Sequence, residues 1–224
     1  MAQLQNSDLD DNVAAYVKKK WPRLKIKNVF DVGAHVGLVT ANFLSAFREA
    51  KVWAFEPVPS TLVEMKGNIA RSSEPDRVKF YDLALGSENK RAFITTISGP
   101  DSANNKLVPP GTPDSIEVGM VRGDSFCADN GVSHIDYLKI DTKGDDFQAL
   151  IGFGPMLSAG AIDFIQVEAG ISKDATDHIN IWKFEDFFYP LGYKLDSIKN
   201  QTSSHIPYLR SADVIFMREA AVRR

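Results

Sequence analysis

The chain has 224 residues, of which 44% are hydrophobic and 25% charged, with a formal net charge of −3. This length and composition predict one globular domain with a substantial core. The weakly negative charge argues against nucleic acid as a partner, because nucleic-acid-binding domains carry a basic face. The single cysteine, Cys127, excludes an internal disulfide and a cysteine-based zinc site.

Membrane insertion and secretion are also not expected. No apolar run approaches the roughly 18 residues of a transmembrane helix. The N-terminal residues 1–11 are polar and acidic, unlike a signal peptide. We therefore expect no membrane partner and a cytoplasmic location.

The first part of the chain alternates between helix and strand. A helix that begins near Ser60 is expected to use that side chain as its N-cap. In chain order the expected elements are a helix at 12–20, a strand at 28–32, a helix at 38–48, a strand at 51–56, the Ser60 helix up to residue 71, and a strand at 78–85.

The later part contains a long loop at 98–115, rich in Gly, Pro, Asn and Asp, and loops of this length often cover a ligand. Alternating strands and helices predict a doubly wound, mostly parallel sheet with ligands at the carboxyl ends of its strands. The other expected elements are strands at 92–97, 116–121, 135–141 and 162–168, helices at 145–153 and 182–191, and a closing antiparallel pair at 193–199 and 212–218.

A glycine-containing turn between the first strand and its helix is the most informative motif. Residues 31–37 read Asp-Val-Gly-Ala-His-Val-Gly, and the next strand ends on Glu56. Glycine lets backbone N–H groups approach a ligand closely, and an acid at the end of the second strand can bind ribose hydroxyls. The sequence therefore predicts a cofactor that contains a nucleoside.

S-adenosylmethionine matches this turn better than a dinucleotide does. The dinucleotide fingerprint G-x-G-x-x-G seats a pyrophosphate on the helix N-terminus. Here His35 replaces the middle glycine, and Asp31 precedes the turn, where an acid repels pyrophosphate but suits a sulfonium and an ammonium. A dinucleotide-dependent oxidoreductase stays open as an alternative, and so does a non-catalytic cofactor-binding module of the same fold.

The order of the motifs resembles the FkbM family of S-adenosylmethionine-dependent methyltransferases, over about residues 28–216. The resemblance implies an α/β, Rossmann-like class I methyltransferase fold, a doubly wound sheet of about seven strands, mostly parallel with the last strand antiparallel. The matching pieces are residues 31–37, Phe55-Glu56-Pro57, Leu83-Ala84-Leu85-Gly86, residues 135–141 with Gly144, and Ile165-Gln166-Val167-Glu168.

The same resemblance implies transfer of a methyl group to a hydroxyl of a small-molecule acceptor, a sugar or a secondary metabolite. It divides the chain into a lead-in helix or cap at 1–27, a methyltransferase domain at 28–218 and a C-terminal tail at 219–224. A homo-oligomer is left open.

The residues implied to bind the cofactor follow the first three strands. Asp31 and the turn would hold the methionine part, Glu56 the ribose hydroxyls through its two acceptor oxygens, and Asp82 or Ala84 the adenine. The full expected set is Asp31, Gly33, Ala34, His35, Gly37, Glu56, Pro57, Asp82 and Ala84.

The catalytic candidates are Asp141 and Glu168, with Lys143 nearby. Methyl transfer depends on positioning and exclusion of water, and an alcohol acceptor also needs a base. Repulsion between two carboxylates on neighbouring strand ends could raise the pKa of one of them, which would then supply that base. Alternatively, the two carboxylates could hold a divalent cation such as Mg²⁺. A third interpretation is structural, in which these acids cap helices or pair with Lys139 or Lys143.

Two further observations concern the same region. The family commonly reads Asp-Val-Glu-Gly after this strand, whereas residues 141–144 read Asp-Thr-Lys-Gly, so Lys143 replaces an acid. His178 and His205 lie in later loops that often cover the acceptor in this fold, and each is an additional candidate base.

Overall fold

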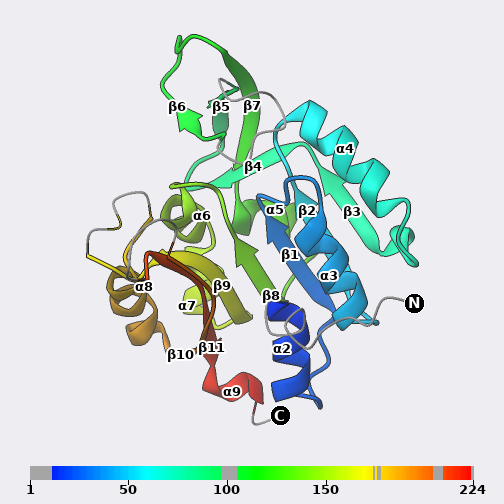
Figure 1. Cartoon of the computed structure of the whole chain (residues 1–224), viewed down its shortest axis with the longest axis vertical. Helices are drawn as coiled ribbons and strands as arrows, with labels where there is room; N and C mark the ends of the chain where they lie inside the picture. The colour runs from blue at the N-terminus through cyan, green and yellow to red at the C-terminus, as the bar shows by residue number, and fades with distance from the viewer. Residues whose placement is uncertain (1–11, 97–104, 174, 176–177, 204–208, 223–224) are drawn as a thin grey trace.

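A seven-stranded sheet runs through the middle of the molecule (Figure 1). The computed structural model describes residues 12–96, 105–173, 175, 178–203 and 209–222. From one edge to the other, the strands are β10 (Tyr193–Thr202), β11 (Ser211–Arg218), β9 (Ile162–Gly170), β8 (Ile135–Ile140), β1 (Asn28–Val32), β2 (Lys51–Phe55) and β3 (Val78–Tyr81).

The strand directions confirm the expected fold class. β1 pairs in parallel with β2 and β8, and β2–β3 and β8–β9 are also parallel. β11, the last strand of the chain, lies antiparallel between β9 and β10. Parallel strands place their carboxyl ends along one edge, which is where ligands bind in open α/β sheets.

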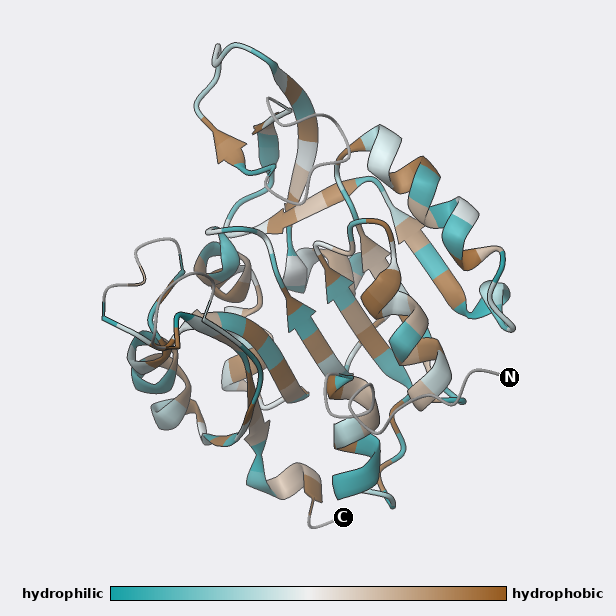
Figure 2. Ribbon diagram, viewed as in Figure 1, coloured by the Kyte–Doolittle hydropathy of each residue, from teal (hydrophilic) through white to brown (hydrophobic). Residues whose placement is uncertain are grey.

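The pleat of β1 separates two apolar cores, one on each face of the sheet. Phe30 and Val32 belong to the first core, whereas Val29 belongs to the second. Alternate residues of a strand point to opposite faces, and Figure 2 shows the resulting bands of apolar and polar residues along the central strands.

Helices from different parts of the chain cover the two faces. The first core is completed by α5 (Gly123–Asp129), α6 (Asp146–Gly152), α7 (Gly154–Ser158) and α8 (Ile181–Phe188). The second is completed by α2 (Val13–Lys20), α3 (Leu38–Ala46), α4 (Pro59–Ile69) and α9 (Glu219–Val222).

A second, four-stranded sheet projects from the carboxyl edge of the first (Figure 1). Its order is β4 (Leu83–Gly86), β7 (Ser115–Arg122), β5 (Lys90–Thr95) and β6 (Leu107–Val108). The single strand expected at 78–85 is wrong, because the chain leaves the main sheet at Asp82 and β4 pairs with β7 instead.

Other expectations were corrected locally. Residues 107–108, expected as loop, pair with β5, while residues 98–104 lie outside the described part of the chain. The predicted Ser60 cap is wrong: α4 begins at Pro59, and the Glu56 carboxylate accepts a hydrogen bond from the Val58 N–H at 2.9 Å. Within the described ranges, none of the helices combines the length and apolarity needed to cross a bilayer.

Candidate functional site

The turn after β1 needs glycine for two separate reasons. Gly33 has φ +73°, a left-handed conformation that side chains other than glycine disfavour. A Cβ on Gly33 would also lie 2.0 Å from the Asp141 carbonyl oxygen at the end of β8. The Gly33 and Ala34 N–H groups donate to the Phe55 carbonyl at 3.1 and 3.0 Å, which joins the turn to the end of β2.

Glu56, directly after β2, is held beside this turn. Its side chain accepts from the His35 N–H at 3.0 Å on one oxygen and from the Val58 N–H at 2.9 Å on the other. Burial raises the pKa of Glu56, and the two backbone donors only partly oppose that shift. Each carboxylate oxygen has a second lone pair, so Glu56 can still accept from two neighbouring hydroxyl groups.

A cavity of about 240 Å³ opens between this turn and the second sheet. Its apolar wall includes Leu83 and Leu85 of β4, Ile94 of β5 and Leu107 of β6. Residues from the expected set that line it are Gly33, Ala34, His35, Glu56, Pro57, Ala84, Asp141 and Lys143.

Four residues of the expected set lie outside the lining of this cavity: Asp31, Gly37, Asp82 and Glu168. Gly37 is the N-cap of α3, with φ +84°. Asp82 is exposed at the point where the chain leaves the main sheet. Among the residues predicted to lie beside adenine, the cavity therefore includes Ala84 and leaves Asp82 out.

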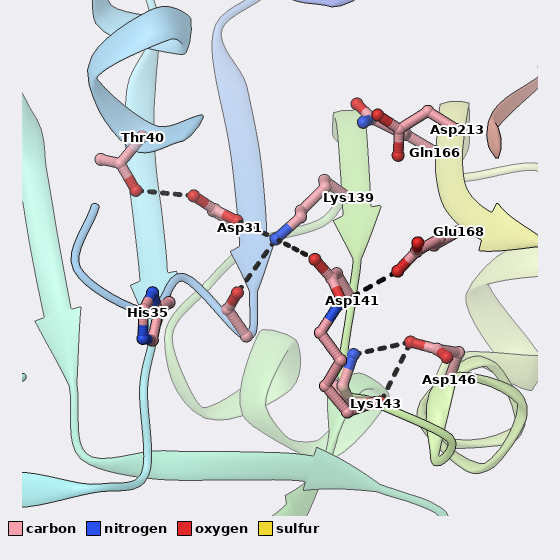
Figure 3. A network of polar contacts seen from close by, with 12 residues as sticks. Asp31, His35, Thr40, Lys139, Asp141, Lys143, Asp146, Gln166, Glu168 and Asp213 are labelled. Carbon is pink, nitrogen blue, oxygen red and sulfur yellow. Dashed lines mark hydrogen bonds and ion pairs between the residues drawn. The ribbon is translucent and has the colours of Figure 1, made fainter. Parts of the chain in front are cut away.

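Asp31 acts on the cavity through Lys139, a residue that the sequence indicated only as a pairing partner. Asp31 is fully buried, accepts from Thr40 Oγ1 at 2.6 Å, and lies 3.2 Å from Lys139 Nζ (Figure 3). Lys139 lines the cavity and donates to the Gly33 carbonyl at 2.9 Å. No local sequence signal indicates this pair, because Asp31 and Lys139 become direct neighbours only through the register of β1 and β8.

Lys139 stays charged although it is buried. Burial alone would lower its pKa, but the carboxylates of Asp31 and Asp141 outweigh that effect and raise the pKa of Lys139. Asp141 Oδ2 lies 3.7 Å from the same ammonium. Lys139 thus links the glycine turn to the end of β8.

The structure brings the three catalytic candidates together. Lys143 Nζ lies 2.9 Å from Asp141 Oδ1 and 3.0 Å from Glu168 Oε2. His178 Nε2 lies 3.0 Å from the other Glu168 oxygen, which also accepts from Ser211 Oγ at 3.2 Å. His205, the other histidine candidate, lies outside the described residues.

The ammonium between the two acids changes their expected chemistry. Burial raises the pKa of Asp141, but Lys139 and Lys143 outweigh it, and the pKa is lowered overall. The expectation that paired carboxylates raise a pKa is therefore wrong for Asp141. The position that Mg²⁺ would take between Asp141 and Glu168 is filled by Lys143 Nζ, so these residues do not fit a divalent cation.

Another polar cluster lies at the amino ends of the central strands. His134 Nε2 contacts Asp163 Oδ2 at 3.0 Å, and Asp136 accepts from the Lys27 and Asn28 N–H groups at 2.9 and 2.7 Å. These contacts join the beginnings of β1, β8 and β9, far from the cavity.

Comparison with known proteins matches residues 31–195 to the family described as the methyltransferase FkbM domain. The chain is 26% identical over 149 residues to the hexuronic acid methyltransferase AglP of Haloferax volcanii. That alignment covers 66% of this chain and 59% of the relative, so the chain spans less than two thirds of its length.

Two solved structures share the fold. Methyltransferase FkbM from Methylobacillus flagellatus KT gives a TM-score of 0.59 at 16% identity, covering 86% of this chain and 43% of that one. Magnesium protoporphyrin IX methyltransferase from Synechocystis PCC 6803, solved with bound S-adenosylmethionine, gives 0.53 at 13% identity, covering 98% and 86%. At these identities the likeness establishes the architecture.

Proposed function

The chain belongs to the FkbM methyltransferase family, and on that premise we propose that it transfers the methyl group of S-adenosylmethionine to a hydroxyl oxygen of a sugar or secondary metabolite. The observation that carries the cofactor assignment is the buried Glu56 carboxylate, 6% exposed, beside the Gly33 turn in one cavity. A carboxylate at the end of the second strand is suited to vicinal ribose hydroxyls.

The proposed cofactor lies across the carboxyl ends of β1, β2 and β4. Its methionine part contacts the turn that begins at Gly33 and the ammonium of Lys139, which Asp31 holds from behind. Its adenine lies against Ala84 and the neighbouring leucines, which supply an apolar surface.

The charges beside the Gly33 turn favour a sulfonium nucleoside over a pyrophosphate. Three acids, Glu56, Asp141 and Asp145, line the cavity together with Lys106, Lys139 and Lys143, and the last two lysines lie within 3.2 Å of a carboxylate oxygen. Lys106 is exposed and lies on the side of the second sheet, just before β6. A pyrophosphate seated at the turn would face Glu56 and Asp141, and the two lysines on that side, Lys139 and Lys143, already pair with carboxylates.

In the proposed reaction the acceptor oxygen attacks the methyl carbon in line with the carbon–sulfur bond. The O–CH₃ bond forms as the S–CH₃ bond breaks, leaving S-adenosylhomocysteine. The hydroxyl proton passes to a carboxylate of the Asp141–Glu168 pair as the O–CH₃ bond forms. The acceptor oxygen is then strongly acidic, so a carboxylate with a lowered pKa such as Asp141 can take the proton. The sulfonium already activates the methyl group, so the chain supplies orientation, exclusion of water and the proton acceptor.

A sugar acceptor is favoured by the AglP relative, whose name specifies a hexuronic acid. The identity of 26% and the partial coverage leave the particular sugar and the reacting oxygen as matters for experiment.

Calorimetry with S-adenosylmethionine, S-adenosylhomocysteine and NADH tests the cofactor. We expect both sulfur compounds to bind and NADH not to bind. Glu56→Gln should weaken S-adenosylmethionine binding about 10- to 100-fold, the range for losing a hydrogen bond to a charged group. Glu64→Gln, on the exposed side of α4, is the matched control and should bind normally.

Turnover is tested separately with methyl-labelled S-adenosylmethionine and a panel of hydroxylated sugars. Transfer that is lost in both Asp141→Asn and Glu168→Gln supports the proposal. Binding of NADH alone would favour an oxidoreductase. Tight cofactor binding without transfer to any acceptor in the panel would favour a non-catalytic module.

A further inference from the structure

We propose that the ammonium of Lys143 is a built-in cation that takes the place of a divalent metal between Asp141 and Glu168 and holds the acceptor hydroxyl. The second part of this proposal rests on the proposed methyltransferase function. The first part concerns only the geometry of three side chains and can be tested without an acceptor.

Each oxygen of the two carboxylates already faces a donor from the protein. Lys143 Nζ contacts one oxygen of each acid, at 2.9 Å on Asp141 and 3.0 Å on Glu168. The second Asp141 oxygen faces Lys139 at 3.7 Å, and the second Glu168 oxygen faces His178 at 3.0 Å. Mg²⁺ demands several oxygen ligands at about 2.0–2.1 Å, so it would have to displace Lys143 to bind here.

The backbone fixes Lys143 in this position. Its φ of +55° is a left-handed conformation that costs a residue with a side chain on the order of 1 kcal/mol. Asp146, at the start of α6, holds the loop by accepting from the Thr142 N–H at 2.7 Å and from Thr142 Oγ1 at 3.1 Å. The loop therefore aims the lysine between β8 and β9 (Figure 3).

Lys143 also reaches the cavity, as one of its lining residues. An ammonium has three N–H donors, and the two carboxylates use two of them. The third N–H can donate to the oxygen of an acceptor hydroxyl, and one of the neighbouring carboxylates accepts the hydroxyl proton. Close carboxylates also keep the ammonium protonated, since they raise the pKa of Lys143 despite its burial.

The metal test compares the native chain with Lys143→Ala and with Lys143→Ala/Glu168→Gln. Mn²⁺ binding is followed by electron paramagnetic resonance, and folding by circular dichroism. We expect the single variant to gain one Mn²⁺ site over the native chain and the double variant to lose it, because only the single variant leaves both acids ionised without the ammonium. Any Mn²⁺ held by His134, Asp136 and Asp163 would be common to all three proteins and is subtracted as the native background. Lys19→Ala, an exposed change on α2, is the control and should behave like the native chain.

The activity test uses Lys143→Met, which keeps the apolar stem and removes the charge. We expect methyl transfer to fall at least 100-fold with S-adenosylmethionine affinity within about threefold of the native chain, and Lys143→Arg to restore part of the rate. Native activity should be unchanged by EDTA or added Mg²⁺.

Three results would overturn the proposal. They are native activity that EDTA abolishes and Mg²⁺ restores, a folded Lys143→Ala variant that gains no Mn²⁺ site, and a Lys143→Met variant with native turnover. If the chain proved not to transfer methyl groups at all, the Mn²⁺ experiment would still decide whether Lys143 occupies a cation site.

Discussion

Lys139 is the buried cation that pairs with Asp31 and holds the Gly33 turn. Its side chain is 6% exposed and its partner Asp31 is fully buried, so neither charge can turn to water if the other is removed. A buried ion pair gives little net stability, but breaking it leaves an uncompensated charge in a medium of low dielectric.

Lys139→Met should therefore destabilise the fold by about 3–5 kcal/mol, and Asp31→Asn/Lys139→Met by distinctly less. Urea unfolding of Lys139→Met, Asp31→Asn and the double variant measures the coupling free energy between the two side chains. Arg91→Met removes an exposed pair with Glu117 and should cost about 0–1 kcal/mol. If the losses in unfolding free energy of the two single variants simply add in the double variant, this account is contradicted.

At Glu56 the direction of the pKa shift predicts how cofactor binding depends on pH. Burial raises the pKa of Glu56 above the ordinary glutamate value of 4.5, so protonation on acidification begins earlier than for an exposed glutamate. A protonated carboxyl has fewer acceptor sites for ribose. S-adenosylmethionine affinity should fall as the pH drops through that raised pKa, and Glu56→Gln should remove this component.

The raised pKa of Glu56 also affects the stability of the fold, and this effect has the opposite pH dependence to that of binding. A carboxyl whose pKa is raised in the folded state makes its most favourable contribution at low pH and loses it as the pH rises. Calorimetric titration across this pH range, with circular dichroism on the same samples, separates loss of binding from unfolding. Affinity that does not change with pH in the native chain would contradict the role of Glu56.

At the scale of elements, the second sheet closes the cavity that the main sheet opens. The chain leaves β3 at Tyr81, forms β4, and later returns through β6, whose Leu107 lines the cavity. Val108, the next residue of β6, does not line it. Substitutions at these two residues of one short strand therefore separate contact with the ligand from general stability.

Leu107→Ala should weaken S-adenosylmethionine binding about fivefold, which corresponds to losing about 1 kcal/mol of apolar contact. Val108→Ala should leave the affinity nearly unchanged. Calorimetry on both variants checks this, and equal effects would show that β6 acts through general stability rather than through contact with the ligand.

At the scale of the whole molecule, the lead-in helix is packed into the domain. Val13, Ala14 and Val17 of α2 are buried in the core that also contains Phe43 of α3. The helix stabilises the same face of the sheet that carries Asp31 and Lys139. The packing of α2 therefore connects the lead-in segment, predicted at residues 1–27, to the core of the domain that follows it.

Val17→Ala should lower the free energy of unfolding by about 1.5–2 kcal/mol, because two buried methyl groups are removed. Lys19→Ala, on the exposed side of the same helix, should change it by less than about 0.5 kcal/mol. Urea unfolding checks both values. A negligible effect at Val17 would mean that α2 contributes little to the fold.

The sequence alone determined the family, the succession along the chain of the strands of the main sheet, and the acid-and-glycine motif at their carboxyl ends. Those features are local: a glycine turn, an acid at a strand end and alternating apolar runs can each be recognised within about ten residues. The sequence did not indicate the short helices α5 and α7.

Only the tertiary structure decided which of these residues reach the cavity and what they contact there. Asp31 and Lys139 are 108 positions apart in the chain and meet only through strand register. The split at Asp82, the pairing of β6 and the position of Lys143 between two acids depend likewise on partners distant in sequence. Burial and ion pairing also set the directions of the pKa shifts, and neither can be seen until the strands are side by side.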